Sequence, residues 1–274
     1  MSDRPSEYSP EAWNELALNL LAQDDQIPWR RYCDALYVSL LDRWLPPGED
    51  RARRALKTDL YDEAVDEGLV SRLGQSSRQV FGLDLSFPIV HTADRRHVSL
   101  RVALTDVRAL PYRAASFDLV LSNSTLDHFP TTEQIDVALA EIARVTRAGG
   151  TLIISLDNLG NPIIRLRQFL PSSPLRRIGL TAYYVGVTHD RKGMVAALER
   201  AGFRIQELTA VMHCPRVAMI PLARALSGSN RAASRFVRVL MSWEQLEKLP
   251  TRYLSGHYLA AKAVRLPASA IPDA

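Results

Sequence analysis

Two stretches near the start of the chain carry apolar residues at every third or fourth position. These residues are Trp13, Leu16, Leu20 and Leu21 in the first stretch and Tyr32, Leu36, Leu40, Leu41 and Trp44 in the second. Such spacing is typical of helices with one buried face. Pro28 separates the two stretches and Pro46 follows the second, so the sequence predicts a pair of helices over residues 9–45. We interpret residues 1–50 as an N-terminal helical cap.

From about residue 54 short apolar runs alternate with helical periodicity. The runs cover residues 80–85, 100–106, 117–123, 151–157, 203–211 and 257–264. Helices are predicted over 133–147, closed by Gly149-Gly150, and over 190–201, closed by Gly202. Strands that alternate with helices indicate βαβ units and a mostly parallel sheet. Residues 51–274 are therefore predicted to form an α/β domain, with insertions at about 160–188 and 213–250.

Composition excludes several classes of protein. The chain has 274 residues, 47% of them apolar, which suffices for a sizeable core. No apolar run approaches the roughly 18 residues of a membrane span, and the first ten residues lack the apolar core of a secretory signal. Cys33 and Cys214 have no CxxC spacing, so neither a disulfide framework nor a cysteine metal site is expected. These features predict a cytoplasmic protein.

Charge divides the chain into an acidic and a basic part. Residues 1–160 hold 17 basic and 24 acidic residues, a charge of −7, whereas residues 161–274 hold 17 basic and 6 acidic residues, a charge of +11. The basic insertions are amphipathic. They fit a lid that favours an anionic or lipid-like ligand, peripheral contact with an anionic membrane, or ordinary solvated helix faces. Nucleic acid is disfavoured, because the chain has neither a basic groove interleaved with aromatic residues nor an NPPY-type motif.

Polar residues follow three of the apolar runs at the point where each run ends. They are Asp84, Asp106 and the pair Ser122-Asn123. Ligands of open α/β sheets bind outside the carboxyl ends of the strands, where one carboxylate can accept both hydroxyl protons of a ribose. The alternative is that strand ends become polar simply because they meet water. Three such positions at successive strands favour a binding site.

Three blocks of sequence resemble the class I S-adenosylmethionine-dependent methyltransferases of the small-molecule, methyltransferase-11-like type. The blocks are VFGLDLS at 80–86, LTDVRALPYRAASFDLVLSNSTLDHF at 104–129 and EIARVTRAGGTLIISLDN at 141–158. The resemblance implies a doubly wound, Rossmann-like sheet of about seven strands with an antiparallel last strand. It also implies S-adenosyl-L-methionine as the cofactor.

The resemblance assigns roles to the residues at the strand ends. It implies Asp84 as the ligand of the cofactor ribose, Leu85 as the residue packed on adenine, Asp106 with Val107 at the adenine edge, and Ser122 and Asn123 near the methionine part.

The loop after the first strand departs from the family pattern. Relatives carry a GxGxG-type turn there, because glycine lets the backbone approach the cofactor closely. The corresponding stretch 55–69 has no glycine before Gly68 and carries Thr58, Asp59 and Glu63 instead. Asp59 or Glu63 could accept a hydrogen bond from the methionine amino group. Larger side chains in this loop must also direct the chain differently around the cofactor.

The function expected from the resemblance is methyl transfer to an O, N or C atom of a small organic acceptor. Because the cofactor carries the reactive methyl group, the protein needs mainly to align the acceptor and exclude water. His128 is the first candidate for a base and Asp127 the second, although His128 could instead cap the helix region after the fourth strand. His189 and the pair Tyr183-Tyr184 could reach the pocket from the insertion.

Two other classes of function stay open. A non-catalytic binding or scaffold protein on the same fold is the main alternative, because the 55–69 loop is atypical. A dehydrogenase is less favoured, since the GxGxxG turn is absent. No metal site is expected, and oligomeric state is left open.

Overall fold

Seven strands form one sheet in the computed structural model, which describes residues 9–22, 27–45, 52–170, 185–267 and 269. The strands are β1 (Ala52–Lys57), β2 (Ser77–Asp84), β3 (Leu100–Leu104), β4 (Phe117–Asn123), β5 (Thr146–Asp157), β6 (Phe203–Val211) and β7 (Tyr258–Arg265). Their order is β3-β2-β1-β4-β5-β7-β6, and only β7 runs antiparallel to its neighbours. The predicted doubly wound, seven-stranded α/β fold with an antiparallel last strand is confirmed.

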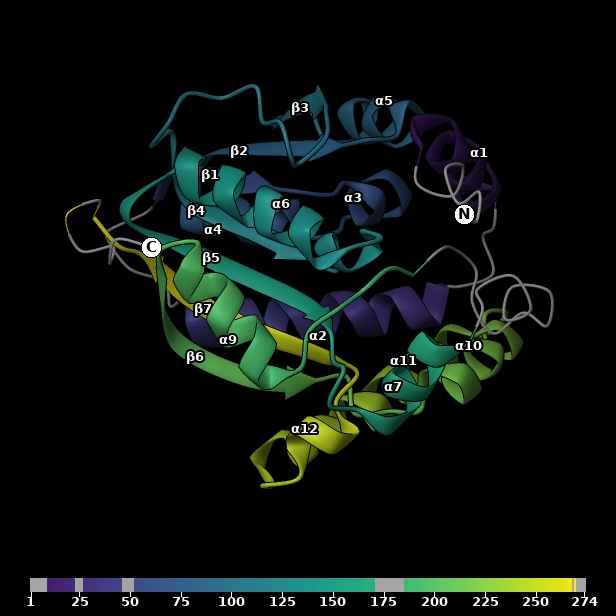
Figure 1. Cartoon of the computed structure of the whole chain (residues 1–274). Helices are drawn as coiled ribbons and strands as arrows, with labels where there is room; N and C mark the ends of the chain where they lie inside the picture. The colour runs from purple at the N-terminus through teal and green to yellow at the C-terminus, as the bar shows by residue number, and fades with distance from the viewer. Residues whose placement is uncertain (1–8, 23–26, 46–51, 171–184, 268, 270–274) are drawn as a thin grey trace, which may run out of the picture.

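Helices cover both faces of the sheet. One face packs against α2 (Ile27–Trp44), α3 (Tyr61–Val65), α4 (Val70–Ser76) and α5 (Phe87–Arg96), and the other against α6 (Thr132–Val145) and α9 (Arg191–Arg200). In Figure 1, α6 and α9 lie in front of the sheet and α2 lies behind it. Each face has its own apolar core, which agrees with strands buried on both sides.

The predicted N-terminal helices are present as α1 (Pro10–Leu21) and α2. Ser9 caps α1 by accepting a hydrogen bond from the backbone of Ala12 at 3.2 Å, a standard way of satisfying a free N–H at a helix start. Tyr32 and Leu41 of α2 are fully buried in the same core as sheet residues such as Leu121. Helix α2 therefore covers part of one face of the sheet. The predicted domain boundary at residue 50 stays a prediction.

Two sequence predictions about local structure are wrong. Gly149-Gly150 does not close the helix before it: α6 ends at Val145, and both glycines lie inside β5. Gly149 has a φ of +75° at an irregularity in the pairing of β4 with β5, where a left-handed backbone favours glycine. The stretch 55–69 is also no simple loop, because Tyr61–Val65 form α3.

The two insertions contribute helices at the carboxyl edge of the sheet. They are α7 (Pro162–Phe169), α10 (Arg216–Ala225), α11 (Asn230–Trp243) and the short η2 (Glu244–Lys248), and α12 (Arg252–Ser255) follows them. A hydrogen bond of 2.7 Å from the Tyr32 hydroxyl to Glu244 joins α2 to η2. Glu244 also accepts from the backbone of Met212 at 2.9 Å, so these contacts fix the second insertion against the end of β6.

Candidate active site

A cavity of about 720 Å³ lies along the carboxyl edge of the sheet. Its floor comes from the residues that follow β1, β2, β3, β4 and β6 and from those at the start of β7. Because β7 is antiparallel, its first residue meets this edge beside the last residue of β5. Residues of α1, α2, α7, α10 and α12 line the remaining walls. One cavity therefore spans almost the full width of the sheet.

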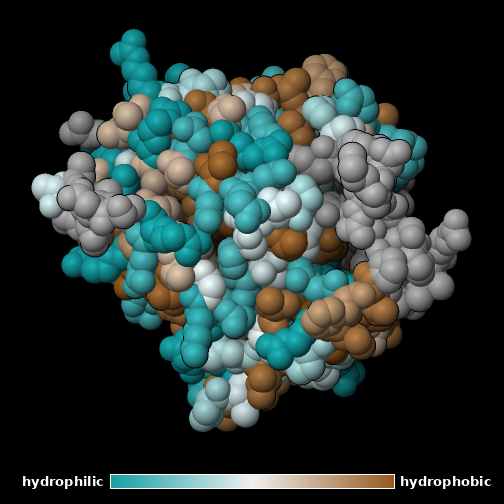
Figure 2. Space-filling view, in the orientation of Figure 1, coloured by the Kyte–Doolittle hydropathy of each residue, from teal (hydrophilic) through white to brown (hydrophobic). Residues whose placement is uncertain are grey.

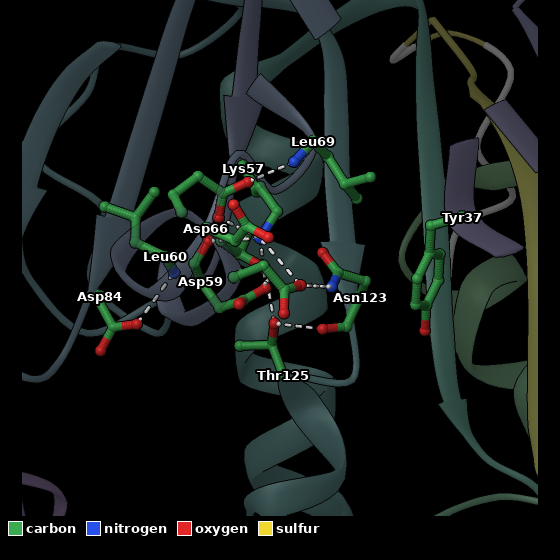
Figure 3. A network of polar contacts seen from close by, with 12 residues as sticks. Tyr37, Lys57, Asp59, Leu60, Asp66, Leu69, Asp84, Asn123 and Thr125 are labelled. Atoms are coloured by element: carbon green, nitrogen blue, oxygen red, sulfur yellow. Dashed lines mark hydrogen bonds and ion pairs between the residues drawn. The ribbon is translucent and has the colours of Figure 1, made fainter. Parts of the chain in front are cut away.

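A buried lysine lies at the end of β1, next to the residues that line the cavity. Lys57 ends β1 and has no exposed surface. Its Nζ lies 2.8 Å from Glu63, 3.2 Å from Asp59 and 4.0 Å from Asp62. Figure 3 labels Lys57 and Asp59 in this polar network. Burial opposes its charge, but the three carboxylates outweigh burial and raise the pKa of Lys57. Lys57 therefore stays cationic and anchors the acids of the loop.

The pKa values of Asp59 and Asp62 shift in opposite directions in this environment. Burial raises the pKa of Asp59 to about 7, more than Lys57 lowers it. Burial also acts on Asp62, but an ion pair with Arg30 of α2, together with Lys57, holds its pKa below the ordinary value. Both aspartates line the cavity. The cluster of Asp59, Asp62 and Glu63 with Lys57 and Arg30 has a net negative charge, which suits a cationic ligand.

Glu63 does not line the cavity. Its side chain is fully buried, pairs with Lys57 and accepts a hydrogen bond of 2.8 Å from the backbone of Leu69. Gly68, with a φ of +55°, leaves room for that carboxylate, because a Cβ at this position would lie 2.5 Å from Glu63 Oε1. This is the only glycine of the stretch, and it serves the packing of Glu63. Of the two acids named as candidates for the amino group, only Asp59 reaches the cavity.

Asp84 lies at the end of β2 with both carboxylate oxygens oriented by the backbone. Oδ2 accepts from Leu60 at 3.0 Å and Oδ1 from Ser86 at 2.8 Å. Burial raises the pKa of Asp84 against these two hydrogen bonds. A carboxylate has about four acceptor positions, so each oxygen of Asp84 retains one for a ligand hydroxyl.

The residues after β3 lie at the same end of the cavity. Asp106 and Val107 line it, as does Leu85 after β2. Arg108 donates to Asp106 through its Nε at 3.0 Å and through its backbone N–H at 2.8 Å. This contact fixes the Asp106 carboxylate in place at the cavity wall.

The end of β4 contributes a short hydroxyl network. Thr58 donates to Ser122 at 2.9 Å and lies 3.0 Å from the Thr125 hydroxyl. Ser122 is fully buried and does not line the cavity, whereas Thr58 and Asn123 do. The Asn123 side-chain N–H donates to Asp62 at 3.4 Å, and its Oδ1 is buried with no hydrogen-bond partner among the described residues. An unpaired buried carbonyl oxygen favours a ligand that donates a hydrogen bond.

The two candidate bases after β4 differ in position. Asp127 is 1% exposed, lies outside the cavity lining and accepts from the backbone of Asp157 at 2.9 Å. This contact ties Asp127 to the end of β5. His128 lines the cavity, and its ring packs edge-on against Trp13 at 5.1 Å between centroids. The residue thus connects the floor to α1.

A second polar group lies over β5 and β7, where the sequence predicted no site residue. His257 precedes β7 and lines the cavity, and its Nε2 lies 3.2 Å from Asp157 at the end of β5. Asp157 also pairs with Arg167 of α7. Arg216 of α10 donates to the Tyr258 hydroxyl at 2.9 Å. The sequence could have indicated His257 as a site residue. In an antiparallel last strand the first residues, rather than the last ones, lie at the carboxyl edge of the parallel strands.

The walls of the cavity are mainly apolar. They come from α1, α2, α7, α10 and α12, and the apolar lining residues include Leu16, Leu20, Trp29, Ile164, Ile220 and Leu254. Three arginines from α7 and α10 also line the cavity, namely Arg167, Arg216 and Arg224. His189 does not line it, and Tyr183 and Tyr184 lie outside the described residues.

Part of the chain is similar in sequence to known proteins. Residues 67–154 match the family model described as a methyltransferase domain. The chain is 32% identical to a malonyl-[acyl-carrier protein] O-methyltransferase of Hamiltonella defensa over 106 residues, which are 38% of this chain and 40% of the relative. The chain therefore spans less than half the length of this curated relative.

Solved structures share the fold at low sequence identity. One is a geranyl diphosphate C-methyltransferase of Streptomyces coelicolor, solved with Mg²⁺, geranyl diphosphate and S-adenosyl-L-homocysteine. It has a TM-score of 0.55 at 14% identity, and the match covers 85% of this chain and 77% of that chain. A [4+2]-cyclase has a TM-score of 0.55 at 18% identity, with 84% and 80% covered.

The strand order and the helices on both faces are those of the class I methyltransferase fold. Within this fold, residues 67–154 are the part that matches a methyltransferase domain by sequence. The family resemblance predicted from the three sequence blocks is therefore confirmed.

Proposed function

We propose that this protein transfers a methyl group from S-adenosylmethionine to an O, N or C atom of a small organic acceptor that has an apolar body and an anionic group. The observation that supports the proposal most is the two-part cavity. Its β1–β4 end is lined by Asp59, Asp62 and Asp84, and its β5–β7 end is lined by apolar side chains with Arg216 and Arg224. A cationic cofactor suits the first end and an anionic amphiphile the second.

The residues of the first end fit the cofactor. S-adenosylmethionine is positively charged at its sulfonium and amino groups, and it carries a ribose diol and an adenine. Asp84 keeps acceptor positions for the diol, and Asp59 and Asp62 supply negative charge for the amino group. The unpaired Oδ1 of Asn123 can accept a hydrogen bond nearby. Leu85, Asp106 and Val107 form the wall proposed for the adenine.

The first experiment is calorimetric titration of the protein with S-adenosylhomocysteine. We expect saturable binding, which Asp84→Ala weakens about 10- to 100-fold, the equivalent of one or two charge-assisted hydrogen bonds. The matched control is Asp94→Ala, which removes an exposed aspartate of α5 away from the cavity. Failure of the unaltered protein to bind S-adenosylhomocysteine would contradict the proposal.

A non-catalytic binding protein, or an enzyme of another reaction on this fold, is the alternative function. The solved [4+2]-cyclase shares the fold without being named a methyltransferase. Calorimetry with S-adenosylmethionine shows whether the protein binds the cofactor at all. Transfer of radioactive methyl label to lipid-like acids and alcohols then separates catalysis from binding, because a scaffold protein would bind without releasing S-adenosylhomocysteine.

We also propose that the molecule contacts anionic membranes at the cavity mouth. No helix among the described residues is long and apolar enough to cross a bilayer. Ile163, Leu166 and Phe169 of α7 are 62%, 62% and 80% exposed, and Figure 2 shows apolar surface where α7 lies in Figure 1. Ile163 also lines the cavity, so apolar surface continues from the cavity to the outside. The insertion helices also carry the exposed arginines Arg165, Arg231, Arg235 and Arg238.

Flotation with vesicles tests the membrane contact. We expect binding to vesicles that contain phosphatidylglycerol, weaker binding to pure phosphatidylcholine, and loss at high salt. Phe169→Asp should reduce binding about tenfold or more, since it removes a large apolar side chain from the contact. Val98→Asp is the control, because Val98 is 97% exposed and precedes β3 at the opposite edge of the sheet. Equal loss in both variants would contradict this contact.

A further inference from the structure

Two residues that contact Asp62 in the cavity each keep one buried polar atom without a hydrogen-bond partner among the described residues. The atoms are Nε of Arg30, which is a donor, and Oδ1 of Asn123, which is an acceptor. Both residues line the cavity. A buried polar atom without a partner costs free energy that a bound ligand can recover. The two atoms therefore indicate which groups a ligand at this place has to offer.

Arg30 of α2 is held in place by two residues of α3. Its Nη2 forms an ion pair with Asp62 Oδ1, and its guanidinium carbon lies 4.5 Å from the centroid of the Tyr61 ring. Its side chain is only 11% exposed. A guanidinium is always charged and only donates hydrogen bonds. The fixed, unpaired N–H of Arg30 therefore suits an anionic acceptor such as a carboxylate.

The side-chain amide of Asn123 has a defined orientation at the end of β4, where the residue is 6% exposed. Burial opposes the ionisation of Asp62, but Arg30 and Lys57 hold the pKa of Asp62 below its ordinary value. Asp62 is therefore ionised and can only accept hydrogen bonds. The amide N–H of Asn123 donates to Asp62 Oδ2 at 3.4 Å. The carbonyl oxygen Oδ1 is thus left for a ligand that donates, such as an ammonium group.

Arg30 and Asn123 approach the two oxygens of a single carboxylate, Oδ1 and Oδ2 of Asp62. A simple cation would leave the Arg30 donor unpaired. A simple anion would leave the Asn123 acceptor unpaired and would meet the negative charge of Asp59 and Asp62. An α-amino acid group carries an ammonium and a carboxylate on one carbon, so it can satisfy both residues.

We propose that Arg30 and Asn123 bind the amino-acid end of the cofactor, Arg30 through the carboxylate and Asn123 through the ammonium group. The inference rests on the proposed function and deepens it. The sequence offered Asp59 or Glu63 for the amino group and no residue for the carboxylate. Helix α2 thereby becomes part of the cofactor site in addition to covering one face of the sheet.

The charges around the two residues fit a zwitterion. Lys57 and Arg30 are paired with Asp59, Asp62 and Glu63, so the acids exceed the cations by one when all five groups are ionised. Asp59 lines the cavity and supplies negative charge to the ammonium group. Arg30 offsets the ligand carboxylate, which Asp59 and Asp62 would otherwise repel.

The position in the sheet also agrees. Strand β1 lies between β2 and β4, Asp84 ends β2, and Asn123 ends β4. Asp84, proposed for the ribose, is therefore two strands from Asn123, about 10 Å across the sheet. A ribose joined through sulfur to an amino-acid chain can cover that distance.

Calorimetry with three ligands tests the assignment. They are S-adenosylhomocysteine, the aminopropyl thioether of adenosine, which lacks the carboxylate, and methylthioadenosine, which lacks both the carboxylate and the amino group. With Arg30→Met we expect the affinity for S-adenosylhomocysteine to fall about 10- to 100-fold, the equivalent of one or two charge-assisted hydrogen bonds. The affinities for the other two ligands should not decrease, because neither has a carboxylate.

Asn123→Ala tests the contact with the ammonium group. It should weaken both ligands that carry the amino group about fivefold or more and leave methylthioadenosine unchanged. Arg31→Met is the matched control, since Arg31 is an exposed residue of α2 that does not line the cavity, and it should leave all three affinities unchanged. If Arg30→Met does not fold, Arg30→Lys keeps a cation beside Asp62 while removing Nε, and the same pattern among the ligands is expected.

Equal loss of affinity for all three ligands in Arg30→Met would mean that Arg30 acts only by holding Asp62 or α2, and the assignment would be wrong. It would also be wrong if the unaltered protein bound methylthioadenosine as tightly as S-adenosylhomocysteine. Neither result contradicts the proposed function, which fails instead if the unaltered protein binds no S-adenosylhomocysteine.

Discussion

Leu60 occupies the space directly above Gly82. The Leu60 side chain is fully buried, and a Cβ added to Gly82 would overlap it. Gly82 thus lets a large residue of the loop after β1 approach β2. The same packing brings the backbone N–H of Leu60 to 3.0 Å from Asp84. The contact between Gly82 and Leu60 therefore helps to hold the backbone N–H that orients Asp84.

This relationship predicts the effect of Gly82→Ala. The added methyl group must displace Leu60, so we expect a loss of about 1–3 kcal/mol in the free energy of unfolding and weaker binding of S-adenosylhomocysteine. Urea unfolding and calorimetry measure the two effects. The control is Gly74→Ala in α4, where a Cβ meets nothing within 4 Å, and stability should rise by up to about 1 kcal/mol. If Gly82→Ala left both the free energy of unfolding and the binding of S-adenosylhomocysteine unchanged, the packing argument would be wrong.

Cofactor binding should depend on pH through Asp59. The pKa of Asp59 is raised to about 7 by burial, and a cationic ligand beside it favours the ionised form. Binding must therefore displace a proton below about pH 7, and affinity should fall by up to about tenfold per pH unit as the pH decreases. Calorimetry from pH 5.5 to 8 measures the trend. Asp59→Asn should bind more weakly and with little pH dependence, and an unchanged pH dependence in that variant would assign the effect to another group.

Lys57→Met should be strongly destabilising. It leaves the fully buried Glu63 without its partner at 2.8 Å, and breaking a buried ion pair costs about 3–5 kcal/mol. The double variant Lys57→Met, Glu63→Gln should recover part of that loss, and the difference gives the coupling energy. Lys192→Met on the exposed side of α9 is the control. Additive effects in the double variant would mean that the pair contributes no coupling.

The pH dependence of stability should have two opposite parts. Asp59 and Asp34 each have a pKa raised to about 7, so their protonated forms stabilise the fold, and that stability is lost as pH rises from about 4 to 7. The pKa values of Asp62 and Asp157 are lowered. Their contribution is present above about pH 4 and is lost as pH falls below it. Thermal unfolding should therefore show a maximum near pH 4–5.5, and Asp59→Asn should flatten the upper part.

Local sequence signals were sufficient to locate most of the strands, whereas the doubly wound sheet with its antiparallel last strand was implied by the family resemblance. The apolar runs that became β2, β3, β4 and β5, and the periodicity of α6, depend on neighbours a few residues apart, so a single sequence contains them. The polar residues Asp84, Asp106 and Asn123 were found for the same reason, since each directly follows or ends its run. The helical boundary at Gly149-Gly150 failed because glycine also marks an irregular strand, and only the pairing with β4 distinguishes the two.

The chain by itself thus determined the fold class and the family resemblance, and it predicted the polar strand ends that line one end of the cavity, because these follow from contiguous patterns. Tertiary structure decided which acids face the cavity, since the burial of Glu63 beneath Lys57 and the contact between Asp62 and Arg30 join separate elements. It also brought together residues far apart in the chain. His257 lies 3.2 Å from Asp157, 100 residues away, because antiparallel pairing brings the start of β7 to the end of β5.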